Sequence, residues 1–217
     1  MSKYDFFDPN PYGAHKRIVQ LTGKNKKVLD VGCATGQVAK KLIENKCEVV
    51  GIEIDDESAQ LAKKYCKDVI IGDIETLETL PYPEKYFDVI IFADILEHLK
   101  DPQAVLLKLK KYLRKDGYIL CSIPNIAHIY IRLNLLLGKW EYRDAGILDR
   151  THLRFFTRKT AIKLIEQAGY KIVEIYYTPW IPLFKLRKFH FGKRLEYYIA
   201  RLFPTLFALQ IIIKAKL

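Results

Sequence analysis

The chain has 217 residues, a formal net charge of +11 and an apolar fraction of 50%. This length and composition favour one folded domain with a sizeable core over a disordered chain. No apolar stretch reaches the length of a membrane-spanning helix, and the first residues lack the basic-then-apolar pattern of a signal peptide. We therefore expect one cytoplasmic domain, residues 1–217. The positive charge indicates either a solvated lysine-rich surface or a negatively charged partner.

Short apolar runs alternate with helical patterns over the first 124 residues. The expected strands are 26–32, 47–54, 68–73, 87–93 and 118–124, and the expected helices are 35–45, 57–66 and 102–113. These strands are apolar on both faces, as in a parallel sheet with helices on both sides. After residue 124 the pattern loosens. A helix at 158–168 and strands at 170–177 and 207–217 follow, so we predict a doubly wound α/β fold.

The first expected strand ends in a glycine bend, VLDVGCATGQ at residues 28–37. Ligands of doubly wound sheets bind at the carboxyl ends of the strands, so this bend is the natural site. A dinucleotide favours GxGxxG, but Ala34 occupies the place of the middle glycine, which counts against NAD or FAD. Gly32 and Gly36 still allow close approach by a ligand, and Asp30 can turn a carboxylate toward an ammonium group.

VLDVGCATG resembles the first motif of class I S-adenosylmethionine-dependent methyltransferases. FDVIIFADILEHL and LRKDGYILCSIPN are similar to the family's fourth and fifth motifs, at the expected distances. The resemblance implies a seven-stranded, mostly parallel sheet with helices on both faces and an antiparallel last strand. It implies S-adenosylmethionine as cofactor and S-adenosylhomocysteine as product. It divides the domain into a cofactor-binding half, 1–124, and a substrate-side half, 125–217.

The resemblance also assigns cofactor-binding residues. Asp30 would face the ammonium group, Glu53 the ribose hydroxyls and Asp73 the adenine amine. The family usually has glycine where this chain has Ala34. The whole expected cofactor set is Tyr12, Asp30, Gly32, Ala34, Gly36, Glu53, Ile54, Asp73, Ile74, Phe92, Ala93 and Asp94.

Three groups are candidates for the acceptor side. Asp94, Glu97 and His98 would share one helix face and could bind a divalent cation, as a similar pattern does in ubiquinone-pathway and small-RNA methyltransferases. We instead expect no metal ligands and activity without added cation. His98 and His152 are the predicted catalytic residues. His152 belongs to ILDRTHLRFFT, which is equally typical of an ion-pair cluster; Asn125 and His128 form the third group.

The stretch from Ile123 to Thr157 resembles methyltransferases found with polysaccharide and glycolipid machinery. This analogy suggests O-methylation of a saccharide, a lipid-linked molecule or another small acceptor. The alternatives are an RNA methyltransferase and a non-catalytic protein that binds the cofactor or serves as a scaffold.

Residues 181–206 interleave basic and aromatic side chains in what we predict to be an insertion. Such a segment suits peripheral contact with an anionic membrane, here the inner membrane face, or, less well, RNA. It equally suits packing against the domain or a second subunit in an oligomer. Its aromatic residues are Phe184, Phe189, Phe191, Tyr197, Tyr198 and Phe203.

Overall fold

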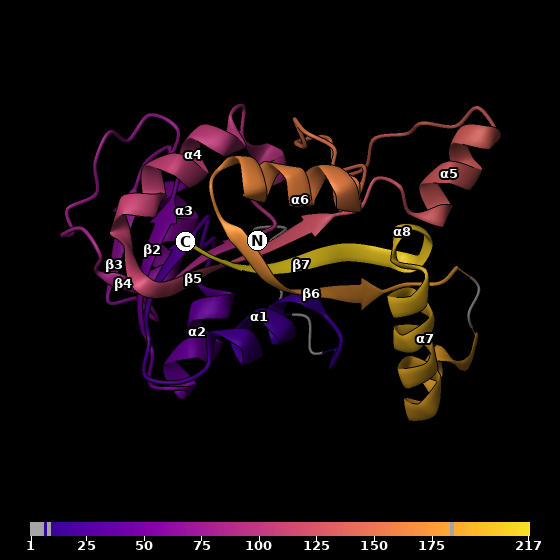
Figure 1. Cartoon of the computed structure of the whole chain (residues 1–217), viewed down its shortest axis with the longest axis horizontal. Helices are drawn as coiled ribbons and strands as arrows, with labels where there is room; N and C mark the ends of the chain where they lie inside the picture. Colours follow the sequence, from indigo (N-terminus) through magenta and orange to yellow (C-terminus); the bar gives the residue numbers. More distant parts are fainter. Residues whose placement is uncertain (1–6, 8–9, 183–184) are drawn as a thin grey trace.

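The computed structural model describes residues 7, 10–182 and 185–217, and its centre is one seven-stranded sheet (Figure 1). The strand order is β3-β2-β1-β4-β5-β7-β6. The strands are β1 (Lys27–Val31), β2 (Glu48–Glu53), β3 (Asp68–Ile71), β4 (Phe87–Ala93), β5 (Leu113–Pro124), β6 (Lys171–Pro179) and β7 (Ala208–Lys216). Neighbours among β1 to β5 pair in parallel, whereas β7 is antiparallel to β5 and β6. The predicted fold class is confirmed.

Helices cover both faces of the sheet (Figure 1). The α-helices are α1 (Ala14–Thr22), α2 (Gln37–Glu44), α3 (Asp56–Ala62), α4 (Pro102–Leu109), α5 (Ile129–Leu136), α6 (Arg158–Gln167), α7 (His190–Leu202) and α8 (Pro204–Phe207). The 3₁₀ helices are η1 (Leu96–His98), η2 (Lys110–Tyr112) and η3 (Lys185–Lys188). Among the described residues, no helix combines the length and apolar character needed to cross a bilayer.

Alternation along the strands builds two cores. Leu29 of β1 packs with α4 and α6 side chains on one face. Its neighbour Val28 packs with residues of α1, α2 and α3 on the other. Because successive strand residues point to opposite faces, strands buried on both sides must be apolar throughout, as the sequence of β1 and β4 is.

The chain reverses its direction of travel across the sheet between β1 and β4. From β1 it proceeds through β2 to β3 at one edge, and β4 then returns to pair with the other side of β1. The loops that follow β1 and β4 therefore run in opposite directions, which leaves a crevice between them at the carboxyl ends of the two strands. This is the place where doubly wound sheets bind ligands.

The structure adds helices that the sequence pattern did not predict. α1 precedes the first strand, α5 follows β5, and η3, α7 and α8 occupy most of the 181–206 segment. Figure 1 shows α7 and α8 at one end of the sheet, beyond the strands that they join. Phe184 lies outside the described residues.

Candidate active site

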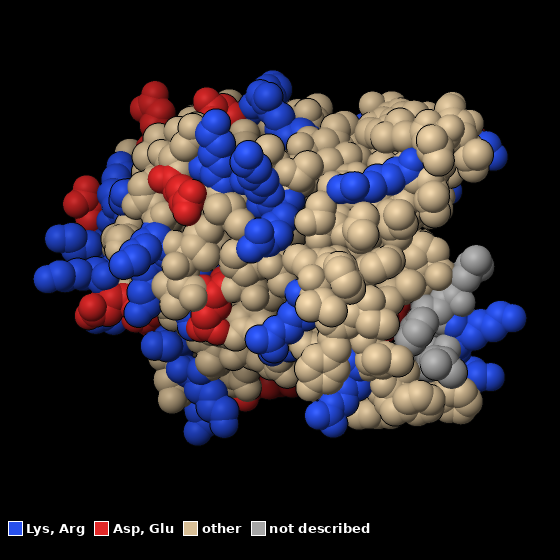
Figure 2. All heavy atoms as spheres, turned by 45° about the vertical axis from the view of Figure 1, so that its right-hand side comes forward, with Lys and Arg blue, Asp and Glu red and all other residues tan. Residues whose placement is uncertain are grey.

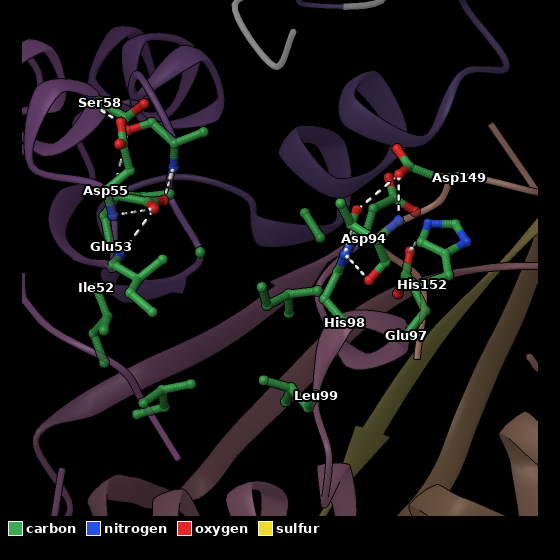
Figure 3. A pocket seen from close by; sticks show the side chains of 18 of the residues that line it. Ile52, Glu53, Asp55, Ser58, Asp94, Glu97, His98, Leu99, Asp149 and His152 are labelled. Carbon is green, nitrogen blue, oxygen red and sulfur yellow. Dashed lines mark hydrogen bonds and ion pairs between the residues drawn. The ribbon is translucent and has the colours of Figure 1, made fainter. Parts of the chain in front are cut away.

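A cavity of about 1100 Å³ lies at the carboxyl ends of β1, β2 and β4 (Figure 3). Its walls come from the loops after β1 to β4 and from residues 145–153. Nine of the predicted cofactor residues line it: Asp30, Gly32, Ala34, Glu53, Ile54, Asp73, Ile74, Ala93 and Asp94. Both predicted catalytic residues, His98 and His152, line it as well. The predicted cofactor and acceptor sides thus share one space.

Three predicted cofactor residues lie elsewhere. Tyr12 stacks its ring on Tyr197 of α7, with centroids 4.7 Å apart. Phe92 is fully buried in the core, because Ala93 and not Phe92 faces the cavity at the end of β4. Gly36 precedes α2 with φ of 80° and packs on Ala62, where an added Cβ would approach Cα to 3.0 Å. Its role is close helix packing and the turn itself.

Glu53, at the end of β2, fastens the glycine bend to the second strand. One carboxylate oxygen accepts a hydrogen bond from the Ala34 N–H at 2.8 Å. The other accepts from Ile54 N–H at 2.9 Å and Asp55 N–H at 3.0 Å. Figure 3 shows these contacts at one side of the cavity. Glu53 therefore shapes the bend in addition to offering oxygens to a ligand.

Asp30 is an ionisable group buried beneath the bend. Its Oδ2 has no hydrogen-bond partner among the described residues, and only 2% of the residue is exposed. Burial first, and the nearby charge of Glu53 second, raise the pKa of Asp30 to about 7. A buried carboxylate oxygen without a donor fits the cationic amino group of S-adenosylmethionine, which would both pair with the charge and satisfy the oxygen.

The bend itself holds two residues in the left-handed region. Gly32 has φ of 73°, and a Cβ there would lie 2.8 Å from Ile95 Cδ1. Ala34 has φ of 46°. A side chain at such a φ is unfavourable, which explains physically why related chains usually have glycine at this place.

Lys108 stabilises the loop that carries Asp73. The Nζ of Lys108, on α4, donates hydrogen bonds to the carbonyl oxygens of Ile74 and, at 2.7 Å, Leu77. Desolvation lowers the pKa of Lys108. Asp73 closes the turn by accepting the Glu75 N–H at 2.8 Å. Sequence reasoning missed Lys108, because nothing in the α4 pattern distinguishes it from a solvated lysine.

Asp94, Glu97 and His98 do not share an α-helix face, contrary to the prediction. Asp94 has φ of 52°, and a short 3₁₀ turn, η1, follows it. Its carboxylate oxygens accept from Gln210 Nε2 at 2.8 and 2.9 Å. Gln210 belongs to β7, so the contact links residues 116 positions apart. No local spacing could have identified Gln210.

Glu97, His98 and His152 form a compact cluster at the acceptor end of the cavity (Figure 3). One potential ligand atom from each lies within 4.8 Å of the others. The two imidazoles meet edge to face with centroids 4.7 Å apart. Glu97 is 1% exposed, and His152 Nε2 lies 3.9 Å from its Oε1. Burial above all, and then the charges of Asp94 and Asp149, raise the pKa of Glu97 well above its ordinary value.

Backbone carbonyls orient the two imidazoles of the cluster. His152 Nδ1 lies 3.0 Å from the Ile147 carbonyl, and His98 Nδ1 lies 3.2 Å from the Thr151 carbonyl. A carbonyl only accepts, so these contacts fit a hydrogen on each Nδ1. Asp149 orders this loop by accepting from both Thr151 N and Thr151 Oγ1.

The third sequence candidate, Asn125 with His128, has a structural role. Asn125 Nδ2 donates to the Ala208 carbonyl at 2.9 Å. His128 Nε2 donates to the Trp180 carbonyl at 2.8 Å, and burial lowers the pKa of His128. Both residues are fully buried and join the start of α5 to the chain around α8. They do not line the cavity, so they have no place in acceptor chemistry.

The arginines near His152 bind other parts of the chain and so stabilise the segment that carries them. Arg150 pairs with Asp144 at 3.0 Å, and Arg154 Nε donates to the Lys100 carbonyl at 3.2 Å. The ion-pair interpretation therefore applies to these arginines, whereas His152, in the same segment, points into the cluster.

Residues 11–175 match the family model described as a methyltransferase domain. Two similar proteins are ubiquinone biosynthesis O-methyltransferases. The one from Coxiella burnetii (strain Dugway 5J108-111) is 25% identical over 161 residues, 69% of each chain. The one from Actinobacillus pleuropneumoniae serotype 5b is 32% identical over 109 residues, 46% of each chain. The chain thus spans about half to two thirds of the length of these relatives.

Solved structures agree on the fold. A methyltransferase from Archaeoglobus fulgidus superposes with a TM-score of 0.67 at 22% identity and covers 100% of both chains. Another from Aquifex aeolicus gives a TM-score of 0.60 at 17% identity, covering 96% of this chain and 93% of that one. These structures agree with the family match, which covers most of the sequence. The chain belongs to the methyltransferase domain family and is an S-adenosylmethionine-dependent methyltransferase.

Proposed function

We propose that this methyltransferase methylates an oxygen of a small-molecule or lipid-linked acceptor. The observation that carries the proposal is the Glu97–His98–His152 cluster, which lines the same cavity as Asp30 and Glu53. When bound, S-adenosylmethionine supplies an electrophilic methyl group on a cationic sulfur. A hydroxyl acceptor must lose its proton as the new C–O bond forms, so it needs a nearby group that accepts one.

The cluster is suited to that task. The imidazoles of His98 and His152 both line the cavity, and each Nδ1 contacts a backbone carbonyl that orients its ring. Either imidazole can accept a proton from a hydroxyl placed between the rings and the cofactor. Holding the acceptor oxygen in line with the methyl group supplies most of the remaining acceleration. Asp30 and Glu53 contribute to that geometry by positioning the cofactor on the opposite wall.

The wall around the cluster favours an acceptor with an apolar part. Ile95, Leu99, Ile147, Leu153 and Leu209 line this region of the cavity. A bare polar saccharide would leave these side chains without matched contacts, whereas a lipid-linked or aromatic acceptor would cover them. The names of the relatives, ubiquinone biosynthesis O-methyltransferases, support transfer to oxygen. The saccharide or glycolipid acceptor stays a narrower proposal that depends on the sequence analogy.

The cluster also favours a divalent cation, which differs from the metal-free expectation. A carboxylate and two imidazole nitrogens within 4.8 Å of one another form a plausible ligand set. The Nδ1 contacts with backbone carbonyls are those expected of metal-binding histidines. Such a cation would bind the acceptor oxygen and lower the pKa of its hydroxyl. Dialysis against EDTA followed by addition of magnesium or zinc separates the two mechanisms: restored turnover assigns the cation, and unchanged turnover assigns the histidines as bases.

The test of the function is transfer of a labelled methyl group. Purified protein would be incubated with labelled S-adenosylmethionine and, separately, with a phenolic lipid, a glycolipid and single-stranded RNA. We expect label in the lipid or glycolipid fraction, as an ether stable to alkali. Label in RNA would favour the alternative RNA methyltransferase. Binding of S-adenosylhomocysteine in calorimetry without turnover on any acceptor would favour the non-catalytic alternative.

A further inference from the structure

Helix α7 exposes four large apolar side chains on one face. Its buried residues are small or polar and follow one another at four-residue spacing: Gly192, Glu196 and Ala200. Its exposed apolar residues form a second stripe: Phe191, Leu195, Tyr198 and Leu202. The helices of a globular domain normally show the reverse arrangement, with the apolar stripe toward the core. The outer stripe is therefore not explained by the fold of this chain.

Positive charge borders this stripe. Arg194 and Arg201 are exposed, and each follows a stripe residue by three positions, so they lie on the same side of the helix. The one acid of α7, Glu196, is buried and accepts the Ile181 N–H at 2.7 Å. The outward face of α7 consequently combines apolar and cationic groups without an exposed carboxylate among its described residues.

A second exposed apolar element lies at the same end of the molecule. Leu136, at the end of α5, is 81% exposed, and Leu133, Leu135, Leu137, Trp140 and Tyr142 are exposed around it. Figure 1 shows α5 and α7 on either side of the strand ends. In Figure 2 this end is largely tan with Lys and Arg at its margins, while Asp and Glu gather over the other half of the face. Apolar patches of this extent usually mark an interaction site.

We propose that α5 and α7 together form a docking surface for an anionic lipid bilayer. Leucines next to arginines suit the boundary between acyl chains and phosphate groups, because leucine can contact the acyl chains while arginine binds the phosphates. Aromatic residues of this surface such as Phe191 could stack on bases, but its most exposed members, Leu136 and Leu202, have no aromatic face, so the patch suits RNA less well. Self-association through α7 would bring Arg194 and Arg201 of two copies toward each other in a chain whose net charge is +11. The charge thus favours a negative surface over a second copy.

Chain segments next to this surface also line the cavity. Pro124 leads into α5, Gly146 follows the Trp140–Tyr142 segment, and Leu209 follows α8; all three line the cavity. Docking through α5 and α7 would bring these parts of the cavity wall close to lipid. The inference goes beyond the proposed function and does not depend on it, because binding to a bilayer is measurable without turnover.

Flotation with vesicles tests the proposal. The full chain would be mixed with phosphatidylcholine vesicles, with or without phosphatidylglycerol, at about 0.1 M and about 1 M salt. We expect flotation with the anionic vesicles at low salt only. The double variants Phe191→Ser/Leu202→Ser and Arg194→Ser/Arg201→Ser should each lower the partition coefficient about tenfold or more. The matched controls, Leu107→Ser on α4 and Lys63→Ser/Lys64→Ser at the end of α3, should float like the parent chain.

Folding and self-association are checked on the same samples. Circular dichroism and S-adenosylhomocysteine binding should be unchanged in all four variants, because none of these side chains lines the cavity. Equal flotation of every variant would overturn the proposal, and so would failure of the parent chain to float. Light scattering that gives a dimer which the Phe191→Ser/Leu202→Ser change dissociates would instead assign the surface to a second copy. A mobility shift with single-stranded RNA that the Arg194→Ser/Arg201→Ser change abolishes would assign it to RNA.

Discussion

The two halves of the chain, before and after residue 125, differ in where their large apolar side chains are exposed to solvent. Before it, the large exposed apolar side chains are scattered, and two of them, Ile54 and Leu61, line the cavity. After it, they are concentrated on α5, α7 and the segments beside them. Hydrogen bonds to backbone amides hold the cofactor wall, whereas helices and long loops form the acceptor wall. The first half thus leaves few large apolar side chains in water, and the second half carries the surface that we propose docks on lipid.

The largest expected effect comes from removing a side chain on the acceptor side of the cavity while the cofactor side stays intact. We expect His152→Ala to lower kcat about 10²–10⁴-fold, because the acceptor hydroxyl loses a proton acceptor or a cation ligand. Affinity for S-adenosylhomocysteine should not change. The matched control is His190→Ala, since His190 is exposed at the start of α7. A parallel loss of cofactor affinity in His152→Ala would mean that the two walls are not separate.

The second test breaks the cofactor wall. Glu53→Ala removes the acceptor of the Ala34, Ile54 and Asp55 N–H groups as well as any bond to the cofactor. We expect weaker S-adenosylhomocysteine binding in calorimetry by about 1.5–3 kcal/mol. The affinity of Glu53→Gln should lie between those of the parent chain and Glu53→Ala, because the amide oxygen of glutamine can still accept a hydrogen bond from the glycine bend. Glu44→Ala, at the exposed end of α2, serves as the control, and unaltered affinity in Glu53→Ala would contradict the assignment.

The predictability of the two halves differs for a physical reason. Buried parallel strands need apolar residues on both faces, and this requirement made β1, β2 and β4 readable within a few residues. The ends of such strands place the site, and the resemblance to the methyltransferase motifs then assigned Asp30 and Glu53 to the cofactor. Phe92, also in the predicted cofactor set, is buried while its neighbour Ala93 lines the cavity, because successive strand residues face opposite sides.

The acceptor half resisted prediction because its signals are not local. Gln210 reaches Asp94 across the sheet, and Asn125 bonds to the Ala208 carbonyl. Residues 181–206 were predicted as an insertion of basic and aromatic residues between two strands, and the structure forms α7 there with an exposed apolar stripe. A periodic pattern identifies a helix but does not say which face meets the core. His152 could be proposed only as part of a dense polar segment, without its partners.

A third test concerns the effect of the buried Asp30 carboxyl on stability. Because the folded-state pKa of Asp30 is about 7 and its ordinary value is 3.8, the folded protein binds this proton more tightly than the unfolded chain does. The contribution of Asp30 to the free energy of unfolding therefore declines as pH rises from about 4 to about 7. Asp30→Asn should remove this decline and raise the free energy of unfolding at pH near 8, while it weakens cofactor binding. Urea unfolding of both proteins across pH measures the difference, with Asp56→Asn as the exposed control. A constant difference at every pH would be inconsistent with a raised pKa.

The smallest expected effect lies where the two halves touch. Tyr12, from the segment before α1, stacks on Tyr197 of α7 at 4.7 Å with the ring planes 19° apart. Tyr12 was predicted to bind cofactor, but in this position it joins the first half to the docking helix. We expect Tyr12→Ala to lower the free energy of unfolding by about 0.5–1.5 kcal/mol, the contribution of one aromatic pair, and Tyr12→Phe to retain most of it. The affinity for S-adenosylhomocysteine should change by no more than a factor of about two, because Tyr12 in this position does not contact the cofactor. A larger loss of affinity in Tyr12→Ala, absent in Tyr197→Ala, would return Tyr12 to the cofactor site and would imply that the cofactor draws this segment away from α7.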